Sequence, residues 1–290
     1  MADDRNEKIE TKIDAYIKNM PSLPTSVAKV LEVCNNPQTS PADLNHVISL
    51  DPVLVGRVLK LINSAYYSLG QNVTSLVRAI IILGINTVKN LALSSSVVGN
   101  LASKKTSVGL NMEGFWRHSL CVGVAAKAIA KKRNIDPKLL EEYFTAGLLH
   151  DIGKIPLNTV LANEYMLTVS ASDRDRVSLF RIEDRNLGIN HSATGAMIVK
   201  AWKLEGTVGD AIKYHHNHLD YDGAHRDLLY TIILANRFAV ETEIGFSGDR
   251  YPEKPGASIW EALNLSPEIY EEIAFFVNSE IEKAEVFLKL

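Results

Sequence analysis

Cysteine is scarce in this sequence, and the scarcity excludes two kinds of structure. Cys34 and Cys121 are the only cysteines among 290 residues, and each lies within an apolar pattern of helical spacing. A disulfide framework needs more cysteines than this, and a thiolate metal site needs them closer together in sequence. We therefore expect two buried, reduced thiols in a protein of the cytoplasm.

Long apolar stretches and an excess of positive charge are also missing. The longest apolar run covers residues 79–85, whereas a membrane-spanning helix needs about 20 apolar residues. The amino terminus is charged and lacks the apolar core of a secretory signal. A net charge of -3 and a pI near 6.3 provide no general attraction for nucleic acid or anionic lipid. We expect neither a membrane nor nucleic acid as a partner.

The alternation of apolar and polar residues typical of a β-strand is not sustained anywhere, whereas helical signals are frequent. Apolar residues recur every three or four positions, as at Leu54, Val58 and Ile62, which is the spacing of one helix face. A capping side chain followed by proline occurs at residues 40–41, 51–52, 136–137 and 266–267. We predict an all-α protein of about fifteen helices.

A polar stretch at residues 103–111 is the best candidate for a boundary between two halves of the chain. We place the division after residue 105. An N-terminal helical subdomain, residues 1–105, would then pack on a histidine-bearing helical subdomain, residues 106–290. A second stretch, residues 245–258, contains two prolines and three glycines, and we predict a long surface loop there.

Histidines and one aspartate form the main candidate site. Five of the eight histidines lie in segments predicted to be helical, and the candidate ligands are His118, His150, Asp151, His191, His215 and His216. A single histidine at a helix end is explained by the helix dipole. Five imidazoles with a carboxylate are better explained by a site for a divalent transition metal. We expect one or two ions of iron, manganese, nickel or zinc. His46 has no candidate ligand near it in the sequence, and we expect His218 and His225 to be loop residues rather than ligands.

Lys154 is the candidate catalytic residue. It follows Asp151 by three residues, about one helical turn, and its ammonium could contact a phosphate held by the metal. The alternative is a solvated lysine near a helix C-terminus, where the helix dipole favours a cation. Both interpretations stay open from the sequence.

The order of these residues resembles the HD superfamily of metal-dependent phosphohydrolases. That pattern has a first His, a His-Asp pair and a final Asp, and His118, His150 and Asp151 match it. The position of the final Asp is taken by Asn236, which the resemblance makes a weak ligand. His191 and the pair His215-His216 are similar to the further ligands of the HD-GYP branch, which holds two ions.

The chain departs from the HD-GYP branch after the His-His pair. That branch continues with Glu, Asp-Gly and Gly-Tyr-Pro, whereas this chain has Asn217, then Asp222-Gly223, then Ala-His-Arg at residues 224–226. The resemblance therefore implies an eroded form of the branch's site.

Motifs of the first half resemble the HDOD family, the HD-related output domain of bacterial signalling proteins. They are Pro-Ser-Leu-Pro at residues 21–24, Asp-Pro at 51–52, Asn-Ser-Ala-Tyr-Tyr at 63–67 and Ala-Ile-Ile-Ile-Leu-Gly at 79–84. The resemblance covers roughly residues 13–240. It implies an all-α fold, an incomplete set of metal ligands and action through regulatory interactions with signalling proteins.

Two functions from different classes follow. One is a signalling output module that binds partner proteins and has a degenerate metal site with little or no catalysis. The other is a metal-dependent phosphohydrolase acting on a cyclic dinucleotide or nucleotide. Two divalent ions need several anionic ligands, and Asp151 is the one carboxylate that the pattern places. We therefore favour the signalling module and expect a second ion to be loosely held or missing. Self-association into a homo-oligomer is left open.

Overall fold

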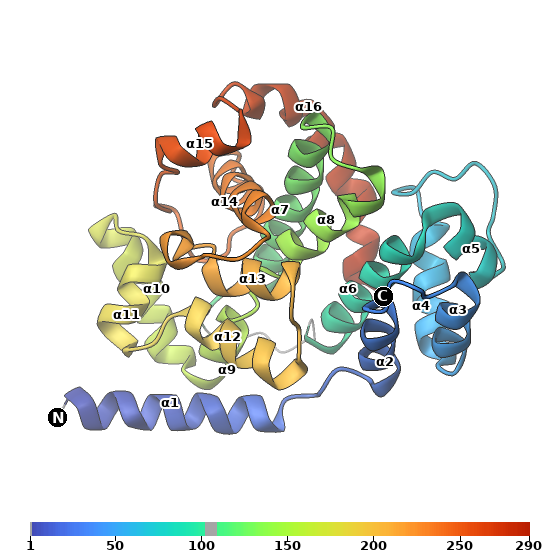
Figure 1. Ribbon diagram of the computed structural model, residues 1–290. Coiled ribbons are helices and arrows are strands. Elements are labelled where there is room, and N and C mark those ends of the chain that lie inside the picture. The colour runs from blue at the N-terminus through green and yellow to red at the C-terminus, as the bar shows by residue number, and fades with distance from the viewer. Residues whose placement is uncertain (1, 102–108) are drawn as a thin grey trace.

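The computed structural model describes residues 2–101 and 109–290 and is entirely helical within them (Figure 1). These residues form sixteen α-helices and three short 3-10 helices, and they contain no β-strand. The predicted all-α fold is therefore confirmed. The predicted boundary between residues 105 and 106 lies outside the described residues, so the division into two subdomains stays a prediction.

The helices that follow α1 form a first group, on the right of Figure 1. They are α2 (Thr25–Cys34), α3 (Pro41–Ser49), α4 (Pro52–Ile62), α5 (Leu76–Leu83) and α6 (Ile85–Leu101). Two of the predicted caps begin helices here. Ser40 and Asp43 form a reciprocal capping box at α3, and the Asp51 carboxylate accepts a hydrogen bond from the backbone of Leu54 at α4.

The second group is built around α7 (Met112–Lys132). This helix packs against α8 (Leu140–Leu149), α14 (Arg226–Glu241) and α16 (Ile269–Ala284). α7 and α8 approach closely because glycine occurs at their contact: a Cβ atom at Gly123 would lie 2.8 Å from the carbonyl oxygen of Phe144. This contact brings the histidine on α7 near the histidine that ends α8.

Six further α-helices complete the second group: α9 (Lys154–Val160), α10 (Ala162–Asp175), α11 (Leu179–Leu187), α12 (His191–Trp202), α13 (Thr207–Tyr214) and α15 (Ala257–Leu263). The 3-10 helices are η1 (Pro137–Leu139), η2 (His218–Asp220) and η3 (Glu285–Lys289). The other two predicted caps differ slightly from expectation. Asp136 caps η1 rather than an α-helix, and α16 begins at Ile269, just after the predicted Ser266-Pro267 start.

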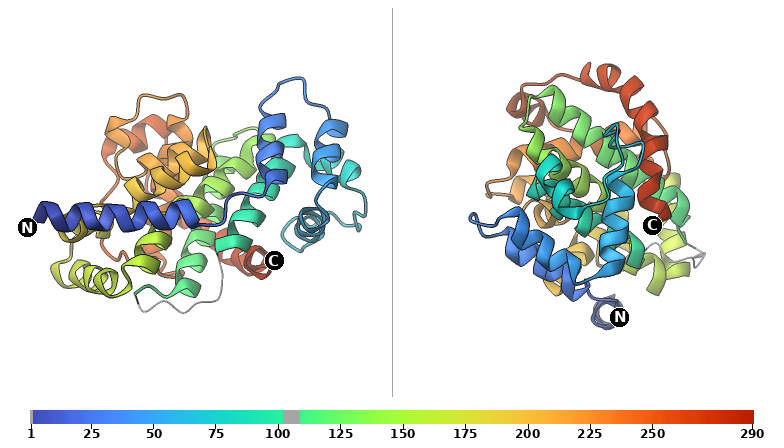
Figure 2. Two further views of the ribbon diagram at one scale, coloured as in Figure 1. Left: turned by 90° about the horizontal axis from the view of Figure 1, so that it is seen from below. Right: turned by 90° about the vertical axis from the view of Figure 1, so that its right-hand side faces the viewer.

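α1 (Ala2–Asn19) does not join the first group but lies along α9 and α12 (Figures 1 and 2). Its buried residues Ile9, Ile13 and Ile17 are spaced by four and form one apolar face. α6 packs on α8, and the buried apolar side chains of both groups form one continuous core. Both α1 and α6 therefore pack against helices that carry the candidate site.

No single helix among the described residues is both long and apolar enough to cross a membrane; α5 and α6 satisfy that test only as a pair, and they are bent by 117°. Both cysteines are free. Cys121 is buried as expected, whereas Cys34 is only partly buried.

Candidate metal centre

His150 and Asp151 lie in the short turn between α8 and α9. Gly153 allows this turn to lie directly against α12. A Cβ atom at Gly153 would lie 1.9 Å from the carbonyl oxygen of His191 and 2.6 Å from the backbone nitrogen of Gly195. Only glycine permits so close an approach. The contact brings Asp151 beside His191, the first residue of α12, although 40 residues separate them in the sequence.

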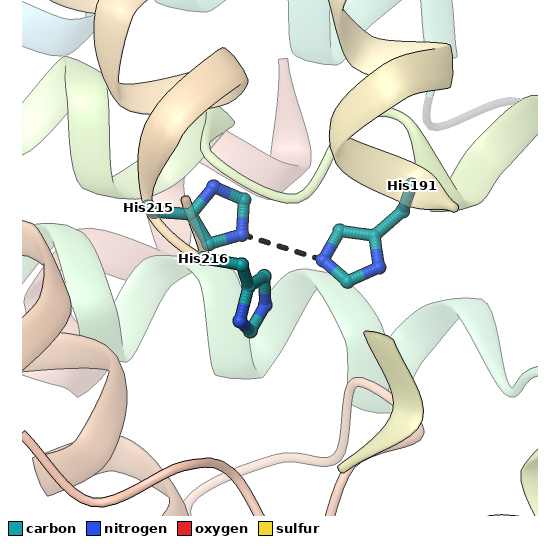
Figure 3. A group of neighbouring side chains, drawn as sticks. All are labelled: His191, His215 and His216. Carbon is teal, nitrogen blue, oxygen red and sulfur yellow. Dashed lines mark hydrogen bonds between the residues drawn. The ribbon is translucent and has the colours of Figure 1, made fainter. Parts of the chain in front are cut away.

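Three polar atoms converge at this contact. The Nε2 atoms of His191 and His215 are 3.3 Å apart, and they lie 3.3 Å and 3.5 Å from Oδ1 of Asp151. Figure 3 shows the rings of His191 and His215 facing each other from α12 and the end of α13, with His216 beside them. His216 also stacks on Phe180, with ring centroids 4.6 Å apart.

The hydrogen bonds on the far side of each ring decide where its lone pair points. Nδ1 of His150 donates to the carbonyl oxygen of Gly147, and Nδ1 of His215 donates to that of Ala211, because a carbonyl can only accept. Nδ1 of His191 lies 2.5 Å from the Glu183 carboxylate, which accepts in the same way when ionised. The Nε2 atoms of His150 and His215 therefore keep their lone pairs and face the centre, and Nε2 of His191 does the same when Glu183 is ionised.

Burial favours the neutral form of four of the imidazoles. It lowers the pKa of His118 to about 3 and the pKa of His215 below its ordinary value. It holds the pKa values of His191 and His216 well below the ordinary value. When Glu183 is ionised, the Nε2 atoms of His191 and His215 both carry lone pairs and cannot hydrogen-bond to each other, so their convergence calls for a cation.

The residues present fit a metal ion. Nε2 of His150 and Oδ1 of Asp151 are buried and have no hydrogen-bond partner among the described residues, which is rare for buried polar atoms. Ligands of a tetrahedral ion at 2.0–2.1 Å would be about 3.3–3.4 Å apart, close to the spacing of the three converging atoms. Two groups of described residues can hold an ion: His191, His215 and His216, and His118, His150 and Asp151.

Asn236 lies beside the second group. Its Oδ1 is 3.0 Å from Nε2 of His118. The structure thus brings all seven predicted ligands into one region, from α7, the α8–α9 turn, α12, the end of α13 and α14. Of the other histidines, His225 contacts the carboxylate of Asp210 at 2.7 Å, and His218 lines a pocket together with His215 and His216.

Lys154 is neither solvated nor at a helix C-terminus, so that alternative is wrong. It is the first residue of α9 and is 2% exposed. Its ammonium donates to Oδ2 of Asp151 at 2.6 Å and to the hydroxyl of Ser247 at 3.2 Å. Burial alone would raise the pKa of Asp151, but the interactions of its carboxylate with His150 and with the ammonium of Lys154 outweigh burial and hold that pKa well below its usual value.

Two residues that the sequence reasoning missed support His191. The Glu183 carboxylate on α11 accepts hydrogen bonds from the hydroxyl of Tyr165, at 2.7 Å, and from the backbone of His191, at 2.8 Å. Glu183 is fully buried, and burial raises its pKa to about 8. A signal was available, because Glu183 occupies a position on the apolar face of an amphipathic helix, next to Ile182.

The loop predicted for residues 245–258 is not wholly at the surface. Ser247 and Asp249 are buried, and burial raises the pKa of Asp249 to about 6. The loop crosses α7 at Gly245, which has φ of +74°, and a Cβ there would lie 2.2 Å from the backbone nitrogen of His118. Apart from this glycine, the single sequence carries no sign that the loop covers the site.

Comparison with protein families assigns most of this chain to one family. Residues 20–218 match the HDOD domain family. The chain belongs to this family, and the resemblance seen in the sequence is confirmed. The match ends before α14, so Asn236 lies beyond it.

Known relatives are distant in sequence. An uncharacterized protein of Treponema pallidum is 24% identical over 230 residues, which are 79% of this chain but 44% of that protein, so the chain spans less than half of this relative's length. The crystal structure of an HDOD domain protein of unknown function from Geobacter sulfurreducens is 23% identical, covers both chains fully and has a TM-score of 0.75.

A second crystal structure has the same overall fold. It is that of a Marinobacter aquaeolei VT8 protein to which a role in signal transduction is ascribed. It is 21% identical and has a TM-score of 0.75, and the comparison covers 98% of this chain and 66% of that one. At these identities both structures support the fold alone.

Proposed function

We propose that this chain is a regulatory module of bacterial signal transduction that acts in the cytoplasm by binding a partner protein. Membership of the HDOD family and the role ascribed to the Marinobacter aquaeolei protein support the proposal. The observation that carries it is the shortage of anionic ligands. Asp151 is the one carboxylate in the two ligand groups of the described residues, and the neutral amide of Asn236 lies beside His118.

The histidine centre, in this proposal, holds a divalent ion of iron, manganese, nickel or zinc. His191, His215 and Oδ1 of Asp151 would hold it, with His216 adjacent. Such an ion supplies a Lewis acid when bound. The ion would link α8, α12 and α13, because its ligands come from the turn after α8, the first residue of α12 and the end of α13. Structural support of these helices is therefore the role we assign to the ion.

We propose the outward face of α5 as the surface that contacts an apolar patch of the partner protein. Val77, Ile81 and Ile82 are 38%, 68% and 45% exposed on this one helix. Apolar side chains grouped on a surface are typical of protein contacts. The variant Ile81→Glu should remain folded and lose binding to a partner. If size-exclusion chromatography with light scattering detects a dimer that this change dissociates, the partner is a second copy of the chain.

The phosphohydrolase is the second candidate, and one observation favours it. A pocket of about 50 Å³ reaches His215, His216 and Asn236 and is lined by Arg237 and Lys254. A purely structural ion needs no such access. The pocket is nevertheless large enough only for a few water molecules, whereas pockets for drug-sized ligands are about 300–1,000 Å³. A cyclic dinucleotide would not fit without rearrangement.

One assay separates the two candidates. Purified protein supplied with Mn²⁺ or Fe²⁺ should show no turnover of cyclic dinucleotides, cyclic nucleotides or nucleotides. His150→Ala is the matched variant because it removes an imidazole that faces the centre. Metal-dependent turnover that this substitution abolishes would overturn the regulatory proposal in favour of the hydrolase.

A further inference from the structure

We propose that the ammonium of Lys154 takes the place of a second metal ion, so that the centre binds one divalent ion per chain. The inference rests on the metal centre proposed above and concerns its stoichiometry. It also gives Lys154 a role other than contact with a phosphate.

The two carboxylate oxygens of Asp151 face different surroundings. Oδ1 lies 3.3 Å from Nε2 of His191 and 3.5 Å from Nε2 of His215, and it has no hydrogen-bond partner. Oδ2 lies 2.6 Å from Nζ of Lys154 and 3.4 Å from Nε2 of His150. A carboxylate that bridges two ions uses one oxygen for each. Here one oxygen faces free lone pairs, and the other is already bound to a cation.

Lys154 is held firmly in this position. Its side chain is buried, and its ammonium also contacts the hydroxyl of Ser247 in the loop that covers the site. On the same side of Asp151, His118 and Asn236 contact each other and supply only neutral groups. A second ion would therefore meet an ammonium and no carboxylate of its own.

The charges of the two ligand groups match one ion better than two. Asp151 is the one carboxylate in these groups, and the ammonium of Lys154 already offsets its charge at Oδ2. A first ion would be held by Oδ1 and two imidazoles. A second ion would be buried beside the ammonium with no further carboxylate in its ligand group, which is strongly unfavourable.

This geometry predicts how substitutions change the number of ions. Lys154→Met removes the ammonium from Oδ2 of Asp151, and Asn236→Asp supplies a second carboxylate beside His118. Each change alone removes one of the two obstacles, so the second ion should bind only partially. Together the two changes remove both obstacles, and a second ion should bind fully.

The experiment is a Mn²⁺ titration of the full chain by equilibrium dialysis with elemental analysis. We expect one ion in the wild type, between one and two in each single variant, and two in the double variant. Electron paramagnetic resonance should detect a spin-coupled manganese pair in the double variant and isolated ions in the wild type. The control is Lys200→Met with Asn35→Asp, which alters two exposed residues and should leave one ion.

The possible failures are distinguishable. Two ions in the wild type, or one in a double variant that circular dichroism shows to be folded, overturn the assignment of Lys154 while the metal centre stands. No ion in the wild type overturns the metal centre itself. If the double variant does not fold, the stoichiometry of the wild type decides between one ion and two.

Discussion

Replacing Glu183 with glutamine tests whether the support behind His191 matters for metal binding. The carboxylate accepts hydrogen bonds from the hydroxyl of Tyr165 and from both the backbone and Nδ1 of His191. An amide has nearly the same shape but only one oxygen, and its NH₂ group cannot accept. At least one donor then loses its acceptor, and the negative charge that makes the imidazole a better ligand is removed.

We expect Glu183→Gln to lower the affinity for metal more than it lowers the stability of the metal-free protein. Because burial raises the pKa of Glu183 to about 8, the metal-free protein at neutral pH holds this carboxyl mostly protonated, and an amide resembles that form. Removing a hydrogen-bonding group behind a metal-binding histidine lowers affinity by about 10–100-fold, equivalent to roughly 1.4–2.8 kcal/mol. We expect a change of this size for Glu183→Gln.

The measurement is a competition between the protein and a fluorescent chelator for Zn²⁺ at pH 7, for the wild type and Glu183→Gln. Glu205→Gln, which changes an exposed glutamate, is the matched control and should bind as the wild type does. His191→Ala sets the scale for complete loss of one ligand. Unchanged affinity in Glu183→Gln, with a clear loss in His191→Ala, would refute the proposed role of the carboxylate.

Three further predictions follow from the same geometry. Asn236→Asp should raise the bound Mn²⁺ per chain in elemental analysis, and an unchanged content would place residue 236 outside the ligand set. Gly153→Ala should destabilise the protein by about 3 kcal/mol in urea unfolding because its Cβ meets the backbone of His191, whereas Gly56→Ala, where the Cβ meets nothing within 4 Å, should not be destabilising. In metal-free protein the folded state keeps the Glu183 proton up to a pKa of about 8, against 4.5 when unfolded, so this group's contribution to stability is complete below pH 4.5 and is lost as the pH rises to about 8. The difference in unfolding free energy between wild type and Glu183→Gln should therefore shift over this range by a few kcal/mol, and a pH-independent difference would contradict the buried position.

Local features were predictable because they depend on neighbours in the sequence. The caps at Ser40 and Asp51 follow from a side-chain acceptor before a proline, and the helices after them follow from apolar spacing. The packing of α1 on α9 and α12 was not predictable in this way. Its apolar face is visible in the sequence, but the surface that covers this face is far along the chain.

The burial of Ser247 and Asp249 was also not predictable from neighbours in the sequence. Glycines and prolines correctly indicated a loop, because both residues interrupt helices. Whether a loop lies in solvent or over a site depends on the shape of the surface beneath it. Here Gly245 allows the chain to cross α7 beside His118, and this contact cannot be deduced from the loop's own composition.

The amino-acid sequence by itself determined the helical class, the family and the chemical types available for a metal, because these depend on spacing and residue identity. Only the tertiary structure decided which atoms face the centre. Contacts between distant segments orient each imidazole, place Glu183 behind His191 and bury Lys154 against Asp151. The direction of a lone pair and the balance of buried charge are properties of packed neighbours, and packing assembles those neighbours from separate helices.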